Sequence, residues 1–197
     1  MLASGVTLYF IRHGETDWNA CGRYQGQIDI PLNAKGRGQA ARNGETLGGI
    51  LKNTAGTLDF VSSPLLRTTQ TMQIARQAMG LDPLDYRTDD RLQEIAYGHW
   101  EGELWSELPV KDAEGFEARR RDTWGWQPRG GESYRMLSER VSGWLVGVSR
   151  DTVVVSHGGV SRAMRGLALG LTPATIPFLE VPQDQVLVIR DGAMSWR

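Results

Sequence analysis

Cysteine, histidine and long apolar runs are all scarce in this sequence of 197 residues. Cys21 is the only cysteine, which excludes an intrachain disulfide and makes a reducing, cytoplasmic compartment the default expectation. We expect this lone thiol to be buried and without a role. No run approaches the ~18 apolar residues of a membrane span, and no basic segment precedes the N-terminal apolar stretch. The protein is therefore expected to be soluble, unprocessed and without a membrane partner.

An excess of charge of either sign is also missing. The chain has 22 Lys and Arg against 23 Asp and Glu, a formal net charge of −1. No global field would recruit nucleic acid, so any anion must be bound by a local arrangement of residues. The length and the 40% hydrophobic content predict a single domain over residues 1–197. A homodimer formed through a sheet edge or an exposed apolar patch is compatible with these data, but nothing in the sequence specifies it.

Strand-like and helix-like segments alternate along the chain, which is typical of an α/β layered sheet. The expected strands are 6–11, 58–62, 152–155, 185–190 and 193–196, the last two joined by a turn at 191–192. The expected helices are 34–51, 63–79, 132–148 and 160–171, and residues 15–32 are expected to be a polar loop. Ser63 is the expected cap of the second helix, with Pro64 at its first position and Arg67 in its first turn. The helix at 34–51 contains five glycines, each costing about 1 kcal/mol relative to alanine, so packing must stabilise it.

Two of the expected strands end in a histidine followed by glycine. Residues 6–11 lead into Arg12-His13-Gly14, and residues 152–155 lead into Ser156-His157-Gly158-Gly159. Because the carboxyl ends of neighbouring parallel strands meet at one edge of an open α/β sheet, His13 and His157 can share one crevice. The helix after His157 points its positive end there, and the glycines let a ligand approach the backbone. A single histidine at a strand end has about even odds of lacking a function. Two such strand-histidine-glycine units together favour an anion-binding site.

Two histidines and two arginines at the ends of these elements suit phosphoryl transfer. Arginine stabilises the charge on the equatorial phosphoryl oxygens through paired hydrogen bonds, which Arg12 and Arg67 could provide. Because phosphomonoester hydrolysis is intrinsically very slow, a covalent route through a phosphohistidine divides the barrier. A nearby carboxyl group would protonate the leaving oxygen and then activate water.

The residues around these features also form an ordered series of short motifs. In chain order they are Leu8 to Thr16, Trp18-Asn19, Arg23, Gln25-Gly26, Asp29, Pro31-Leu32, Ser62 to Leu65, Arg67-Thr68, Leu92, Glu94, Gly98, Trp100 to Gly102, Gly130 to Ser133 and Val155 to Gly159. This series resembles the histidine phosphatase superfamily, the phosphoglycerate-mutase-like proteins, and covers nearly the whole chain. The resemblance implies a three-layer α/β/α sandwich with a mostly parallel central sheet, and it favours the phosphatase branch.

The resemblance also implies roles for particular residues. His13 would be the nucleophile and Glu94 the proton donor, while Arg12, Arg67 and His157 would hold the phosphoryl oxygens. The expected substrate-binding residues are Asn19, Thr16, Gly158 and Arg23. Neighbouring arginines would keep His13 unprotonated for attack. A structural salt bridge remains the alternative role of Glu94.

Neither a metal nor a cofactor is expected. A zinc hydrolase would need a third ligand, and His13, His157 and His99 lack metal-ligand spacing. His99 matches no catalytic position and is expected to be a structural or rim residue.

The expected substrate is a small phosphorylated metabolite, such as α-ribazole phosphate or a sugar or glycerate phosphate. Its identity depends on residues 94–133, where the run Arg119 to Arg121 and four tryptophans could contact the substrate or form a solvated face. Phosphoglycerate mutases of this family have a longer insertion here, so hydrolysis is favoured over isomerisation. A cofactor-dependent mutase is the alternative function, and a non-catalytic phosphate-binding module is a lesser one.

Overall fold

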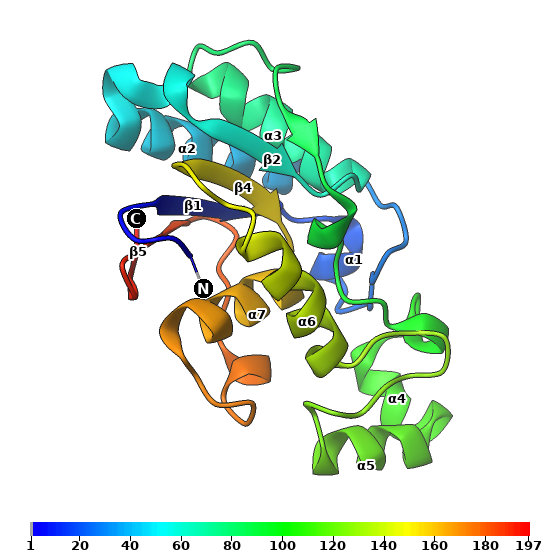
Figure 1. Ribbon diagram of the computed structural model, residues 1–197. Helices are drawn as coiled ribbons and strands as arrows, with labels where there is room; N and C mark the ends of the chain where they lie inside the picture. Colours follow the sequence, from blue (N-terminus) through cyan, green and yellow to red (C-terminus); the bar gives the residue numbers. More distant parts are fainter. Residues whose placement is uncertain (1) are drawn as a thin grey trace.

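A computed structural model describes residues 2–197 and contains a six-stranded sheet between two layers of helices (Figure 1). The strand order is β3-β2-β4-β1-β5-β6. The strands are β1 (Thr7–Arg12), β2 (Asp59–Ser62), β3 (Arg87–Thr88), β4 (Thr152–Ser156), β5 (Val186–Arg190) and β6 (Ala193–Trp196). Strands β1 to β4 pair in parallel, whereas β5 and β6 are antiparallel to their neighbours. The expected mostly parallel α/β/α sandwich is confirmed.

Helices α2 (Ala34–Leu51) and α3 (Leu66–Ala78) cover one face of the sheet, and α6 (Tyr134–Leu145) and α7 (Gly158–Leu169) cover the other (Figure 1). Successive side chains of β1 point to opposite faces of the sheet, because a β-strand is pleated. Phe10 packs with the buried residues of α6 and α7, whereas Ile11 packs with those of α2 and α3. Two separate apolar clusters therefore fix the sheet from both sides.

The expected elements are mostly confirmed, but the start of the second long helix is not. The first strand, the helix at 34–51, the two terminal strands and the turn between them lie within one residue of their expected bounds. Ser63 and Pro64 precede α3, whose N-cap is Leu65 without a side-chain hydrogen bond. The expected capping role of Ser63 is therefore wrong, although Arg67 does lie in the first turn.

Residues between the main elements form shorter helices. Helix α1 (Asp17–Ala20) lies inside the segment expected to be a loop, and Thr16 caps it. Helices α4 (Leu108–Lys111) and α5 (Ala113–Arg121) extend away from the sheet (Figure 1). Within residues 2–197, no helix combines the length and apolar character needed to cross a bilayer.

Tight packing against α3 explains one of the glycines of α2, Gly44. A Cβ atom added at Gly44 would lie 2.4 Å from the Ala75 carbonyl oxygen and 2.7 Å from its Cα atom. A Cβ at Gly49, in the same helix, would meet nothing within 4 Å. Gly44 thus permits a close approach of two helix backbones that a larger residue would prevent.

We expect Gly44→Ala to lower the free energy of unfolding by about 2 kcal/mol, because the two backbones must separate and loosen the packing between them. Gly49→Ala is the matched control in the same helix and should raise stability by about 0.5–1 kcal/mol, since alanine is the better helix former. Urea denaturation of the three proteins measures both changes. Equal effects of the two substitutions would show that α2 and α3 are not tightly packed at Gly44.

Candidate functional site

The two histidines lie side by side at the carboxyl ends of neighbouring parallel strands. Arg12 of β1 is in register with Ser156 of β4, so His13 and His157 leave the sheet together. The backbone amide of His13 donates to the Ser156 carbonyl oxygen at 2.9 Å. The imidazole centroids are 5.2 Å apart, with 60° between the ring planes. The predicted shared crevice is therefore present in the structure.

The hydrogen bonding of His13 leaves one ring nitrogen free. Its Nδ1 lies 2.8 Å from the Gly14 carbonyl oxygen, which only accepts hydrogen bonds, so Nδ1 carries the proton. The other nitrogen, Nε2, then has an available lone pair. Burial lowers the pKa of His13 well below the ordinary value, and the nearby Arg67 and Arg12 lower it further. A neutral imidazole with an unprotonated Nε2 is the form that a nucleophile requires.

His157 is anchored behind His13 by Ser63. Its Nε2 lies 2.8 Å from the Ser63 hydroxyl oxygen, and this contact accounts for the position of Ser63 ahead of α3. Burial again lowers the pKa of His157 well below the ordinary value, with Arg67 the largest of the neighbouring charges that act in the same direction. The Nδ1 atom of His157 is buried and has no hydrogen-bond partner among residues 2–197.

Arg12 and Arg67 are held in place by backbone carbonyl groups. Arg12 donates from Nη1 to Val181 at 2.7 Å, and Arg67 donates to Ile28 and Gly26 at 2.8 and 2.7 Å. Burial lowers the pKa of Arg67 to about 10, so its guanidinium remains charged at neutral pH. Neither arginine forms an ion pair within the described part of the chain.

Both arginines also keep one donor unused. The Nε atoms of Arg12 and Arg67 are buried and lack a partner within residues 2–197, like Nδ1 of His157. Native proteins rarely leave buried polar atoms unpaired, so such atoms at one place indicate a missing ligand. The three residues are those expected to hold phosphoryl oxygens. The two Nε atoms can donate hydrogen bonds to a bound oxyanion, and Nδ1 of His157 can do so in the tautomer whose Nε2 accepts from the Ser63 hydroxyl.

Glu94 contacts the start of α7. Its carboxylate accepts hydrogen bonds from the Gly159 amide at 3.0 and 3.1 Å and from its own neighbour Ile95 at 2.9 Å. None of the ion pairs within residues 2–197 includes Glu94. The alternative role as a structural salt-bridge partner therefore has no support in the structure.

Arg12, His13, Arg67 and Glu94 lie around a cavity of about 160 Å³, whereas His157 packs against the His13 ring and does not line the cavity. The residues lining it are Arg12, His13, Asn19, Arg23, Tyr24, Gln25, Gly26, Arg67, Glu94, Tyr97, Gly158 and Arg162. Four guanidinium groups and a single carboxylate make its wall strongly positive, which favours a multiply charged anion. The expected residues Asn19, Arg23 and Gly158 lie in this wall.

Thr16 is the expected substrate-binding residue that does not line the cavity. It is fully buried, and its hydroxyl donates to Gln25 at 2.9 Å while accepting from the Asn19 amide at 3.1 Å. Thr16 therefore positions Asn19 and Gln25, which do line the cavity.

Sequence reasoning missed Arg162 and Gln183, and also the cavity-lining residues Tyr24 and Tyr97. Arg162 is four residues after Gly158 and shares its helix face, a spacing that could have revealed it. The Gln183 side chain donates to the His13 carbonyl oxygen at 3.1 Å and to Asn19 Oδ1 at 3.2 Å. Gln183 follows no motif and reaches the site from a segment far along the chain, so no sequence pattern points to it.

His99 and Cys21 lie outside this cavity. His99 is exposed and its Nε2 lies 2.9 Å from Asp112 Oδ2, which is the expected structural position. Cys21 is exposed, so the expectation of a buried thiol is wrong. It follows the short helix α1, which buries none of its residues and leaves the thiol in solvent.

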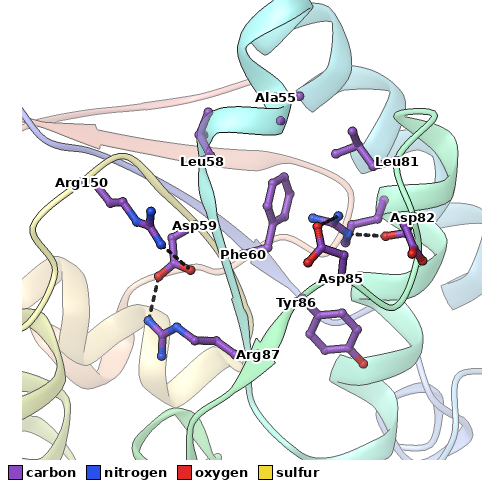
Figure 2. Close-up of a pocket in the computed structure, with 12 residues that line it drawn as sticks. Ala55, Leu58, Asp59, Phe60, Leu81, Asp82, Asp85, Tyr86, Arg87 and Arg150 are labelled. Carbon is purple, nitrogen blue, oxygen red and sulfur yellow. Dashed lines mark hydrogen bonds and ion pairs between the residues drawn. The ribbon is translucent and has the colours of Figure 1, made fainter.

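A larger hollow of about 450 Å³ lies at the opposite end of the sheet (Figure 2). Asp59, at the start of β2, is in register with Thr152 at the start of β4, far from the carboxyl ends. The charges here pair with one another: Asp59 contacts Arg87 and Arg150, and Arg76 contacts Asp85. No histidine lines this hollow, and its charges are balanced, so it lacks the features of the candidate site.

Comparison with known proteins gives a match over almost the whole chain. The model of the histidine phosphatase superfamily, branch 1, matches residues 8–197. The chain belongs to the histidine phosphatase superfamily. The cavity of this histidine phosphatase lies at the carboxyl ends of β1 and β4, which carry the Arg12-His13-Gly14 and Ser156-His157-Gly158-Gly159 motifs.

Histidine phosphatases similar to this chain have different names. A probable phosphoglycerate mutase from Salmonella paratyphi C is 36% identical over 198 residues, covering 96% of this chain and 83% of that protein. A mycobacterial glucosyl-3-phosphoglycerate phosphatase, solved with VO3, is 30% identical with a TM-score of 0.79, covering 98% and 96% of the two chains. An α-ribazole phosphatase from Shigella flexneri is 26% identical with a TM-score of 0.81, covering 98% and 95%. The structural neighbours named here are phosphatases acting on small phosphorylated compounds.

Proposed function

We propose that the protein is a metal-independent phosphomonoester hydrolase that acts through a phosphohistidine on a small phosphorylated metabolite. One observation carries this proposal: three unpartnered buried nitrogen atoms, on Arg12, Arg67 and His157, accompany a neutral His13 whose Nε2 is free. The donors suit three phosphoryl oxygens, and the lone pair suits attack on phosphorus. These features at one site support nucleophilic phosphoryl transfer.

The reaction divides into two displacements. In the first, Nε2 of His13 forms a bond to phosphorus while the bond from phosphorus to the leaving oxygen breaks, and the Glu94 carboxyl group gives that oxygen its proton. In the second, water gives a proton to the Glu94 carboxylate and attacks phosphorus. The nitrogen–phosphorus bond breaks and inorganic phosphate leaves, so His13 and Glu94 return to their initial states.

Arginine side chains would supply the charge stabilisation that a metal ion provides in other phosphoryl-transfer enzymes. Arg12 and Arg67 are fixed by carbonyl groups before any ligand binds, so little reorganisation is needed. Within residues 2–197, no group of three or more His, Cys, Asp or Glu is placed to hold a metal ion. The donor set of this site suits an oxyanion.

A cofactor-dependent phosphoglycerate mutase is the second candidate, because the Salmonella relative has that name. The mutase would return the phosphoryl group from His13 to a glycerate, so both reactions share the first displacement. The phosphatase names of the two structural neighbours and the short lobe formed by α4 and α5 favour water as the acceptor. A docking module without turnover would not need the nucleophile and the carboxylate that this cavity retains.

Phosphate release in EDTA from a panel of phosphomonoesters tests the proposal. The panel contains 3-phosphoglycerate, sugar phosphates, α-ribazole phosphate and an aryl phosphate. We expect release from at least one compound, and the preferred compound would identify the substrate class. Activity that disappears in EDTA and returns with a divalent metal would overturn the metal-independent scheme. Interconversion of 2- and 3-phosphoglycerate with a bisphosphate primer, without phosphate release, would establish the mutase.

A further inference from the structure

Resting on the proposed function, we infer that the leaving group of the substrate ends in a ring that stacks on Trp105 in a second cavity beside the catalytic one. This second cavity has a volume of about 230 Å³ and is lined by Gly22, Arg23, Tyr24 and Trp105. Arg23 and Tyr24 line both cavities. A substrate whose phosphoryl group lies at His13 can therefore extend past Arg23 and Tyr24 toward the indole.

Aromatic rings form the wall along this path. Tyr97 lines the catalytic cavity, and its ring centroid is 4.2 Å from that of Tyr24. The Tyr24 centroid is in turn 5.7 Å from that of Trp105. Flat faces and edges in succession suit a ring better than an acyclic chain, because stacking depends on planar contact.

Trp105 is held in position by the backbone yet remains open to solvent. Its amide donates to the Gly22 carbonyl oxygen at 3.1 Å, and the Tyr24 amide donates to the Glu103 carbonyl oxygen at 3.0 Å. Trp105 nevertheless remains 43% exposed. A fixed, exposed indole on the wall of a cavity is a preformed stacking surface, so a ligand need not order it.

Two arginines near the second cavity have no carboxylate partner within the described residues. Arg23 lines the cavity and lies over the Trp18 ring, and Arg119 lies over the ring of Trp105, which also lines it. Their guanidinium groups can donate to ring substituents of the leaving group. A sugar ring and an aromatic base both satisfy this chemistry, so the test must separate them.

Three phosphate esters distinguish these ligands: glycerol 3-phosphate has no ring, ribose 5-phosphate has a sugar ring, and adenosine 5′-monophosphate has an aromatic ring beyond the sugar. We expect Trp105→Ala to lower kcat/KM about 10-fold for the esters whose ring reaches the indole, since a stacked ring typically contributes that much. The value for glycerol 3-phosphate should change less than about twofold. A loss for both ring esters would indicate stacking of the sugar, and a loss for adenosine 5′-monophosphate alone would indicate stacking of the base.

Two further variants and a binding measurement complete the test. Trp105→Phe should retain most of the preference for ring esters, and Phe178→Ala, which removes an exposed aromatic side chain outside both cavities, should change nothing. Inhibition by inorganic phosphate should be unchanged in Trp105→Ala, which shows that the catalytic cavity is intact. Equal loss for all three esters, or no loss for any, would overturn the inference.

Calorimetric titration separates this inference from the proposed function. In the His13→Ala background nothing turns over, so the three esters can be compared by affinity alone. Weaker binding of ring esters after addition of Trp105→Ala would support the second cavity even if the wild-type protein hydrolysed none of them. Absence of hydrolysis by the wild-type protein would count against the proposed function only.

Discussion

His13→Ala should reduce phosphate release by at least about 10⁴-fold, because no other group in the cavity can take the place of its Nε2 atom in the first displacement. His13 and Glu94 are the histidine and acidic residues that line the cavity. The Glu94 carboxylate accepts a hydrogen bond from the Gly159 amide and does not replace the imidazole. Initial rates of phosphate release from the preferred ester measure the loss. The wild-type protein, quenched during turnover, should carry a phosphoryl group on His13 that the variant lacks.

The control for this prediction is a second histidine. His99 is exposed and contacts Asp112, away from the cavity, so His99→Ala should retain near wild-type rates. Because His13 is almost completely buried, its removal could also loosen the fold, and thermal unfolding of His13→Asn checks this with a smaller loss of volume. Turnover of a folded His13 variant at more than about a hundredth of the wild-type rate would mean that the histidine is not the nucleophile.

The pairing of His13 with His157 can be predicted from sequence because it depends on local patterns. Two short apolar strands, each followed by histidine and glycine, are compatible with parallel neighbours, and in the structure the register of Arg12 with Ser156 brings the rings together. The same reasoning explains why Arg67 is found in the first turn of α3. Features that depend on one strand or one helix turn can be predicted without knowledge of the rest of the fold.

Ser63 shows why features that depend on tertiary contacts cannot be predicted from local sequence. Serine followed by proline is typical of a helix start, but here the hydroxyl contacts His157, which is distant in the sequence, and the helix begins at Leu66. Tertiary contact therefore overrides local propensity at this position. Gln183 and the carbonyl group of Val181 likewise reach the site only through the fold.

The lobe formed by α4 and α5 has no clear sequence signal for a different reason. Helix α5 buries none of its residues, so it lacks the apolar periodicity by which a helix is recognised. It contacts Trp105 instead through Phe116, at 5.2 Å between ring centroids, and through Arg119, which lies over the indole. Trp105 lines the second cavity, so the part of the site proposed here to select the substrate is the part that sequence predicts least well.

Glu94→Gln should lower kcat/KM by about 10²- to 10⁴-fold for alkyl phosphates, whose leaving oxygen needs a proton as the bond to phosphorus breaks. For an aryl phosphate with an acidic leaving group the loss should be only a few-fold, because that oxygen departs as an anion. The amide keeps the size of the carboxyl group and an oxygen that can accept from Gly159, so the fold should be preserved. A series of esters with graded leaving-group pKa values measures the dependence, and Glu117→Gln, an exposed carboxylate paired with Arg120, is the control.

The two kinetic constants of this variant should respond differently, because Glu94 is proposed to act in both displacements. The value of kcat/KM reports the steps up to formation of the phosphohistidine, so it should depend on the leaving group. The value of kcat for aryl phosphates should instead fall to a common limit set by hydrolysis of the phosphohistidine, which lacks its base, and the phosphoenzyme should accumulate. If kcat/KM fell equally for all esters, Glu94 would not be the proton donor. If it depended on the leaving group while kcat for aryl phosphates was unchanged, Glu94 would act as the acid alone, and another group would activate the water.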